Sequence, residues 1–175
     1  MYEIELAEPS KELEIPAMKY RQEHIDSGES WINGSCSFMK YSSYDEWLTR
    51  VAQTKNAGTS HFGVSATTYF SIRKSDNRII GSIQLRHDLT PELKTSGGHI
   101  GYNIRPSERK NGYGKQQLML VLDVARQIKI SKVMISCDKD NIASSATALI
   151  CGGVLACENL HEGKLQQIFW IDLRQ

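Results

Sequence analysis

The sequence lacks a long hydrophobic run and has almost no net charge. No apolar stretch approaches the ~18 residues that a membrane-spanning helix needs, so we expect no membrane partner. The first residues, M-Y-E-I-E-L-A-E-P, are acidic and alternate in polarity, unlike a secretion signal, and we expect a cytoplasmic protein. A net charge of +1 over 175 residues argues against a strongly basic nucleic-acid binder.

Cysteines are few and do not form a recognisable ligand pattern. The four, Cys36, Cys137, Cys151 and Cys157, make no C-x-x-C pair. Two of them lie in apolar segments, which is typical of buried free thiols in a reducing compartment. The five histidines are scattered along the chain. We therefore expect neither a zinc site nor any other metal.

What is present predicts one α/β domain over residues 1–175. The chain is 40% hydrophobic and 23% charged, an ordinary globular composition without repeats or linkers. Its periodicity predicts strands over residues 2–7, 66–74, 78–86, 98–105, 132–137, 154–160 and 165–173. Helices are expected over 11–27, after the capping box Ser43-x-x-Glu46, and over 115–129 and 142–150. A right-handed crossover makes strands 98–105 and 132–137 parallel, within a mixed sheet of about seven strands that has helices on both faces.

The segment 105–115, R-P-S-E-R-K-N-G-Y-G-K, joins a predicted strand to a predicted helix and is typical of an anion site. The first amides of a helix lack internal partners and carry partial positive charge. Gly112 and Gly114 allow an anion to approach the backbone closely. The local charge is +3, from four basic residues against one acidic residue: Arg105, Arg109, Lys110 and Lys115 against Glu108.

Two common phosphate-binding patterns do not fit this loop. The Walker pattern fails because Gln116 stands at its Ser/Thr place and Arg109 at its first glycine. The dinucleotide pattern is weak because Gln117 replaces its third glycine and the loop lies in mid-chain. The pattern that remains is R-x-x-G-x-G, from Arg109, Gly112 and Gly114.

In this setting R-x-x-G-x-G resembles the GNAT superfamily of N-acetyltransferases, and the resemblance covers essentially the whole chain. The strand G-H-I-G-Y-N-I-R-P resembles the family's bulged strand, whose edge pairs with pantetheine. The segment N-I-A-S-S-A-T-A-L-I-C-G-G resembles the family's Asn-led helix, in a less characterised branch. The resemblance implies the GNAT fold, acetyl-CoA as co-substrate, and transfer of an acetyl group to a primary amine of a small molecule or peptide.

The resemblance also implies which residues contact the cofactor. They are Ile104, Arg105, Arg109, Lys110, Asn111, Gly112, Tyr113, Gly114, Lys115, Asn141 and Ser144. Asn141 has a second possible role, as the cap of the helix that it leads; we expect both roles together.

Acetyl transfer needs a base, a polarised carbonyl and a stabilised leaving thiolate. A backbone amide near Asn103 is where the family would polarise the carbonyl. His99 is the most suggestive base because imidazole titrates near neutral pH, although it could also be a packed or solvent-facing residue of its strand. His87 and Glu92 are weaker candidates.

Many GNAT members carry a tyrosine that acts as general acid, seven residues after the asparagine that leads the helix. In this sequence Ala148 stands at that place. The usual general acid is therefore absent. Tyr102 and Tyr113 lie in or next to the predicted strand and loop that bind the cofactor. The geometry of that strand and loop need not bring either hydroxyl to the thioester sulfur. Either no dedicated acid is used or water supplies the proton.

The acceptor site is expected in the N-terminal half, from helix 11–27, segment 28–41 and loop 87–97. Segment 28–41 is either a loop whose aromatics, Trp31 and Phe38, fold onto the core, or a flap over the substrate. Glu29 and Trp31 are the predicted substrate contacts. Glu23, Asp26 and Glu29 could attract a cationic amine, or could be merely solvated acids.

Two other functions compete with catalysis. A non-catalytic acyl-CoA-binding module is compatible with Ala148. A nucleotide-binding protein is disfavoured because no Ser or Thr follows Lys115 to hold Mg²⁺. The chain is expected to act as a monomer or homodimer.

Overall fold

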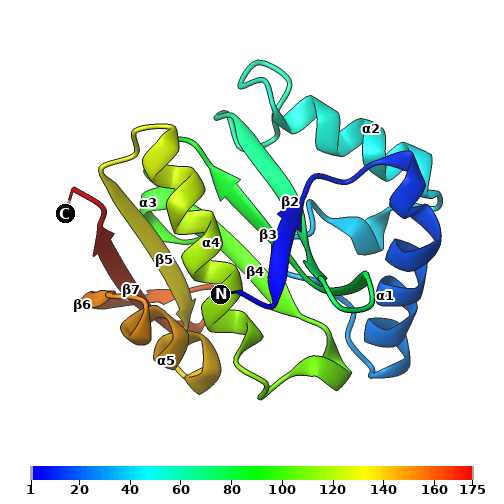
Figure 1. Cartoon of the computed structure of the whole chain (residues 1–175). Helices are drawn as coiled ribbons and strands as arrows, with labels where there is room; N and C mark the ends of the chain where they lie inside the picture. The colour runs from blue at the N-terminus through cyan, green and yellow to red at the C-terminus, as the bar shows by residue number, and fades with distance from the viewer. Residues whose placement is uncertain (1, 175) are drawn as a thin grey trace.

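The computed structural model describes residues 2–174, which form an α/β fold of seven strands and five α-helices (Figure 1). The strands are β1 Ile4–Ala7, β2 Ala66–Arg73, β3 Arg78–Arg86, β4 Ile100–Ile104, β5 Lys132–Asp138, β6 Val154–His161 and β7 Lys164–Asp172. The helices are α1 Glu14–Asp26, α2 Tyr44–Thr54, α3 Pro91–Thr95, α4 Tyr113–Gln127 and α5 Ile142–Ile150. Within these residues no helix is long and apolar enough to cross a membrane.

The seven predicted strands are present, but they form two sheets. One has the order β1-β2-β3-β4 and the other β5-β7-β6, and all pairs within each are antiparallel. Helix α4 returns the chain between β4 and β5, so these two neighbours run in the same direction (Figure 1). The amide of His99 donates to the Met134 carbonyl at 2.8 Å and joins them at one end. No ladder continues beyond this point within residues 2–174, so the two strands part.

Helices cover both faces of the first sheet, as the sequence predicts. The apolar stripe of α4 packs onto one face with the inward residues of β3, β4, β5 and β7: Leu118, Val121, Leu122 and Ala125 with Ile83, Leu85, Ile100, Val133, Ile135, Phe169 and Ile171. Helices α1 and α2 cover the other face, where Tyr20 and Trp47 meet Phe70 of β2. Side chains of a strand alternate between the two faces, so neighbouring residues of β3 serve different sides of the molecule.

The capping box that starts α2 is present, with Ser43 accepting from the Glu46 amide and Glu46 accepting from the Ser43 amide. The short helix α3 was not predicted, although Thr90 caps it and Pro91 opens it, both of which are helix-start signals. Five residues were too few to show a helical period.

The predicted bulge in the strand before the loop is wrong. Strand β4 pairs residue for residue with β3, from Gly81 opposite Ile104 to Leu85 opposite Ile100. The irregularity lies instead in the ladder between β2 and β3, beside Ser71. The gap beside β4 therefore arises from the missing ladder to β5 and not from a bulge.

Candidate functional site

A cleft of about 1330 Å³ opens where β4 and β5 part. Strand β4 forms its floor from Ile100 to Ile104. The start of α4, the first turn of α5 and the end of β5 line one side. Segment 28–40 and part of β3 line the other. The cleft therefore reaches both faces of the sheet, and two molecules can approach β4 from opposite sides.

The start of α4 presents a row of unpaired amides to this cleft. Gly112 is its N-cap, with φ +78° and no side-chain cap, and a Cβ placed there would meet no atom within 4 Å. The first helical bond runs from Gln116 N to Gly112 O. Within residues 2–174, the amides of residues 110–115 donate to no acceptor. Such a row at the positive end of a helix suits a diphosphate.

The edge of β4 that faces the cleft also has backbone groups that no strand pairs with within residues 2–174. Arg105 N donates to Ile80 O at 2.7 Å, towards β3. Successive residues of an antiparallel strand direct their N–H and C=O groups to opposite edges. Tyr102 and Ile104 therefore turn theirs towards the cleft, where a linear molecule containing amides can pair with them.

Nine of the eleven predicted cofactor residues line this cleft. They are Ile104, Arg109, Lys110, Gly112, Tyr113, Gly114, Lys115, Asn141 and Ser144. Asn141 also caps α5, because its Oδ1 accepts from Ser144 N at 3.1 Å. Asn111 is exposed but does not line the cleft.

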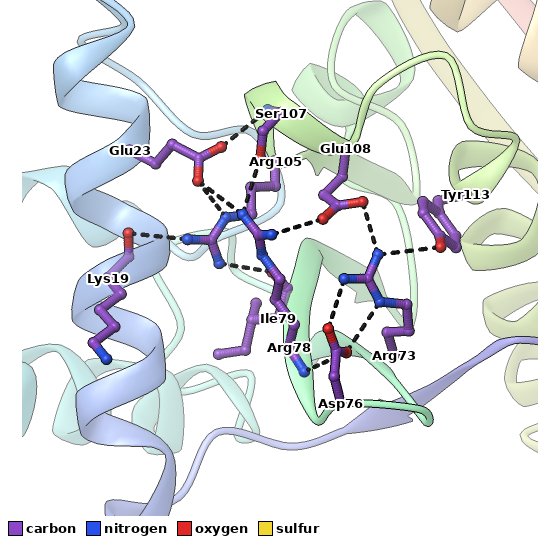
Figure 2. Close-up of polar contacts among 10 residues, drawn as sticks. All are labelled: Lys19, Glu23, Arg73, Asp76, Arg78, Ile79, Arg105, Ser107, Glu108 and Tyr113. Atoms are coloured by element: carbon purple, nitrogen blue, oxygen red, sulfur yellow. Dashed lines mark hydrogen bonds and ion pairs between the residues drawn. The ribbon is translucent and has the colours of Figure 1, made fainter.

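Arg105 was predicted to bind cofactor, and that prediction is wrong. Its side chain is buried, does not line the cleft and points towards Glu23 of α1 (Figure 2). Its Nε donates to Glu23 at 2.6 Å and its Nη1 to Ile79 O at 3.1 Å. Burial works to raise the pKa of Glu23, but hydrogen bonds from Ser107 and Arg105 outweigh it and lower that pKa to about 2. Arg105 thus fastens the end of β4 to α1.

A second ion-pair group holds the β2–β3 hairpin against the loop before α4 (Figure 2). Glu108 is buried between Arg73 at 2.8 Å and Arg78 at 3.0 Å. The hydroxyl of Tyr113 accepts from Arg73 at 3.3 Å. This contact directs the Tyr113 hydroxyl towards the β2–β3 hairpin, and we do not assign Tyr113 as the missing acid.

Arg109 links the cofactor loop to the predicted acceptor segment. Its Nη1 lies 2.6 Å from Glu29 Oε1, and its Nε donates to Ile104 O at 3.0 Å. The other oxygen of Glu29 accepts from Nδ1 of the buried His24 at 2.8 Å. Burial works to raise the pKa of Glu29, but Arg109 and His24 together lower it. Glu29 lines the cleft as a carboxylate whose charge is already compensated.

The acidic cluster expected to attract a cationic amine is therefore largely neutralised. Glu23 is held by two arginines and Glu29 by Arg109. Asp26 is exposed and accepts from Gln22 at 2.8 Å. These acids act mainly as structural ion pairs.

His99 does not fit its predicted role as base. It is 6% exposed and does not line the cleft. Its Nδ1 accepts from Met134 N at 2.9 Å, so the neutral ring carries its proton on Nε2 and has no free lone pair. Burial lowers the pKa of His99 to about 4. The residue joins β4 to β5. The weaker candidates, His87 and Glu92, do not line the cleft either.

Asn103 lines the cleft, but its backbone amide faces β3 by the alternation that Arg105 sets. The amides available to polarise a carbonyl are therefore those of Tyr102 and Ile104. The side-chain Oδ1 of Asn103 is buried and has no partner within residues 2–174.

Sequence reasoning did not place Tyr102, which reaches the cofactor side of the cleft. Its hydroxyl lies 2.9 Å from Ser144 Oγ in the first turn of α5. Ala148, one turn further along α5, is fully buried. Burial raises the pKa of Tyr102 to about 12, so its hydroxyl is protonated at neutral pH. The period-2 alternation of β4, with Ile100 and Ile104 on the same face, was the available signal.

Segment 28–41 packs one of its two aromatics onto the core and leaves the other at the cleft. Phe38 is fully buried and stacks on Trp47, with ring centroids 4.2 Å apart. Trp31 is 43% exposed and lines the cleft, with Lys40 Nζ 5.3 Å from its ring centroid. One aromatic anchors the segment and the other faces the cleft.

Comparisons with known proteins identify relatives of this arrangement. Residues 18–154 match a family model described as an acetyltransferase (GNAT) domain. No curated protein matches the chain significantly by sequence.

Solved structures share the fold at low identity. A ribosomal-protein-S5-alanine acetyltransferase from Vibrio fischeri has a TM-score of 0.73 at 13% identity, covering 100% of this chain and 96% of its own. RimL, a ribosomal L7/L12 alpha-N-protein acetyltransferase in complex with coenzyme A, has a TM-score of 0.70 at 18% identity, with coverage of 98% and 95%. A chimera of spermidine N-acetyltransferase SpeG from Vibrio cholerae and hSSAT has a TM-score of 0.69 at 13% identity, with coverage of 98% and 96%.

Proposed function

Because the chain belongs to the GNAT family of acetyltransferases, we propose that it transfers the acetyl group of acetyl-CoA to a primary amine of a small molecule or peptide. The observation that carries the proposal is the row of unpartnered amides, residues 110–115, at the end of a cleft floored by the free edge of β4. A diphosphate and an amide-containing arm are the chemical groups that these two features complement.

Acetyl-CoA supplies an activated acyl group, and different residues of the chain suit different parts of this molecule. The amides of residues 110–115, with the side chains of Lys110 and Lys115, suit the diphosphate. The cleft-facing backbone groups of Tyr102 and Ile104 suit the pantetheine arm. Arg109 now occupies the Ile104 carbonyl, so pairing at that oxygen requires Arg109 to turn away, towards the anion.

Tyr102 is the proposed acid. Its hydroxyl holds a proton at neutral pH and lies on the cofactor side of β4, beside α5. In position it replaces the tyrosine that Ala148 removes from α5. The alternative function, a module that binds acyl-CoA without catalysis, follows from Ala148 alone, and the placement of Tyr102 favours catalysis.

A thiol-release assay tests the proposal. Purified protein with acetyl-CoA and a panel of primary amines should release coenzyme A only when an accepted amine is present, and mass spectrometry should find the acceptor heavier by one acetyl group. Matched alcohols should give no product. Acetyl-CoA binding without release for any amine would support the non-catalytic module. Absence of binding would remove both readings.

The named relatives act, by their titles, on ribosomal proteins and on spermidine, so both peptide and small-molecule amines belong in the panel. The four cysteines are free thiols, which fits action in a reducing cytoplasm. We propose a monomer or homodimer.

A further inference from the structure

One half-buried cation on the acceptor side of the cleft, Arg86, has no counter-charge within residues 2–174. Arg86 ends β3, on the same strand face as Ser82 and Gln84 and opposite the α4 face. Its side chain lines the cleft together with His61, Phe62, Gln84, Gly97 and Gly101. No role in the acetyl-transfer chemistry above uses it.

The hydrogen bonds of Arg86 leave one edge of its guanidinium free. Nη1 donates to Gly97 O at 3.1 Å and to Gly98 O at 2.8 Å. The guanidinium carbon lies 4.4 Å from the ring centroid of Phe62. Nε is buried without a partner, and Nη2 bonds to no acceptor within residues 2–174. The unused Nε–Nη2 edge carries two parallel donors, the arrangement that pairs with both oxygens of a carboxylate once Nε is uncovered.

No acid compensates this charge. Within residues 2–174, no carboxylate lies within 4.0 Å of Arg86, whereas Arg73, Arg78, Arg105 and Arg109 all have one. Asp88, on the same face of the extended strand, accepts from Leu89 N instead. An unpaired charge that is largely removed from water is costly, and desolvation lowers the pKa of Arg86 to about 10.

The surroundings of Arg86 are electropositive. His61, which also lines the cleft, has its pKa lowered to about 4 by burial and by the charges of Arg50, Arg86 and Lys40. Glu29, which lines the cleft, is already neutralised by Arg109. This part of the site therefore favours an anion over a polycation.

We propose that Arg86 binds a carboxylate of the acceptor, so that the accepted amine carries a carboxylate a short distance from its nitrogen. The inference rests on the proposed acetyl transfer. Arg86 N donates to His99 O, and Tyr102 lies three residues further along β4, about 10 Å away. A free amino acid carries such a carboxylate, as does a peptide with an acidic residue beside its amino terminus.

Paired acceptors test the inference on the unaltered protein. Each free amino acid is compared with its carboxamide, and each peptide with Asp or Glu at its second position with its Asn or Gln counterpart. The carboxylate member should have a kcat/KM higher by about tenfold to a hundredfold, the usual effect of a charge-assisted pair. Preference in the first series identifies free amino acids, and preference in the second identifies peptides. Equal use of both members in both series overturns the inference.

Variants then assign the preference to Arg86. Arg86→Gln should abolish the discrimination within each pair while the KM for acetyl-CoA stays within about twofold of the original. Arg86→Lys, which keeps the charge but loses the fork, should retain part of it. Arg126→Gln removes an equal charge from an exposed site outside the cleft and should keep the discrimination intact. Discrimination that survives in Arg86→Gln contradicts the inference.

Binding measurements separate this inference from the proposed function. Calorimetry with acetyl-CoA tests the cofactor site alone. Thermal-shift titration with the preferred carboxylate, in the presence of coenzyme A, tests Arg86 without turnover. Stabilisation by the carboxylate but not by its amide, lost in Arg86→Gln, supports the inference even if no thiol is released. If Arg86→Gln fails to fold because it loses its bonds to the Gly97 and Gly98 carbonyls, the carboxylate and amide titrations of the unaltered protein decide.

Discussion

At the scale of single residues, Tyr102 carries the chemical part of the account. Its hydroxyl is protonated at neutral pH, bonds to Ser144 and lines the cofactor side of the cleft. An acid at this place shortens the lifetime of the leaving thiolate, and general acids typically contribute about 10²-fold or more. The residue thus offers a way for a chain with Ala148 to remain catalytic.

We predict that Tyr102→Phe lowers kcat by about tenfold to a hundredfold and leaves acetyl-CoA affinity unchanged, because only the hydroxyl is removed. Steady-state thiol release and calorimetry measure the two quantities. Ser144→Ala, which removes the partner but keeps the phenol, should have the smaller effect. A kcat unchanged in Tyr102→Phe would mean that water protonates the sulfur.

Glu23 is the residue whose ionisation should matter most for stability near β4. Its pKa of about 2 lies below the ordinary value of 4.5, so its stabilising effect is full above pH 4.5 and disappears as the pH falls towards 2. We predict that Glu23→Gln lowers the free energy of unfolding at pH 7 by about 1–2 kcal/mol, allowing for solvent screening.

Urea denaturation at pH 7 and at pH 3 checks this prediction. The difference between the original protein and Glu23→Gln should narrow at the lower pH. Asp26→Asn, three residues along the same helix but without an arginine partner, is the matched control. A difference as large at pH 3 as at pH 7 would show that the ion pairs with Arg105 and Arg78 are not its cause.

These residues also show where sequence reasoning stops. The glycines of residues 112 and 114 and the cap Asn141 were predicted because their signals are local. Arg105 was misassigned because its carboxylate partner, Glu23, comes from a helix 82 positions earlier. The same holds for Arg86, whose isolation depends on which acids lie elsewhere in the fold. A sequence shows that a residue is charged, but it does not show which residue of opposite charge lies beside it in the fold.

At the scale of elements, the junction between β4 and β5 decides whether a cleft exists. His99 makes both ends of the contact, donating its amide to Met134 O and accepting Met134 N on Nδ1. Beyond it the strands part, and the residues that follow line the cleft. His99 therefore holds the two strands together at the closed end of the cleft.

We predict that His99→Ala lowers the free energy of unfolding by about 1–3 kcal/mol, because Met134 N–H is left buried without an acceptor. The folded pKa of about 4 lies below the unfolded value of about 6.5, so the contribution of His99 is full above pH 6.5 and declines as the pH falls towards 4. The variant should lose this part of the pH dependence in urea denaturation between pH 7 and pH 5.

The pH profile of kcat/KM distinguishes this structural role of His99 from a role as catalytic base. For His99→Ala the profile should keep its shape. A profile that loses its ionisation near neutral pH, in a variant of unchanged stability, would restore the catalytic role that the sequence suggested.

Element boundaries were predictable where a helix had room to show its signals. The capping box of α2 and the apolar stripe of α4 fall within two residues of their predicted places. The division into two sheets was not predictable, because strand patterns give which face is buried and not which neighbour is bonded. A local bulge was expected where a missing ladder was found.

At the scale of the whole molecule, the two sheets are joined at one end and part to form a cleft. The two sides of this cleft offer different chemical groups. The α4 side offers free amides and lysines, which suit an anionic cofactor. The α1 side offers Trp31, Asn103 and the uncompensated Arg86. Cofactor and acceptor can then meet across β4 without competing for one entrance. The sequence predicted the cofactor because the residues on the cofactor side lie close together in the chain. The acceptor side is assembled from segments far apart in the chain.

The most direct test of the central claim is calorimetric titration of acetyl-CoA into the original protein, Gly112→Glu and Gly163→Glu. Both glycines have a positive φ, +78° and +80°, and open space beyond their Cβ positions, so the backbone strain of the two substitutions is matched. Gly163 lies in the β6–β7 hairpin, away from the cleft. We predict that Gly112→Glu weakens binding by more than about a hundredfold, since a carboxylate would occupy and repel the diphosphate place, while Gly163→Glu binds as the original does. Retained affinity in a folded Gly112→Glu would contradict the account.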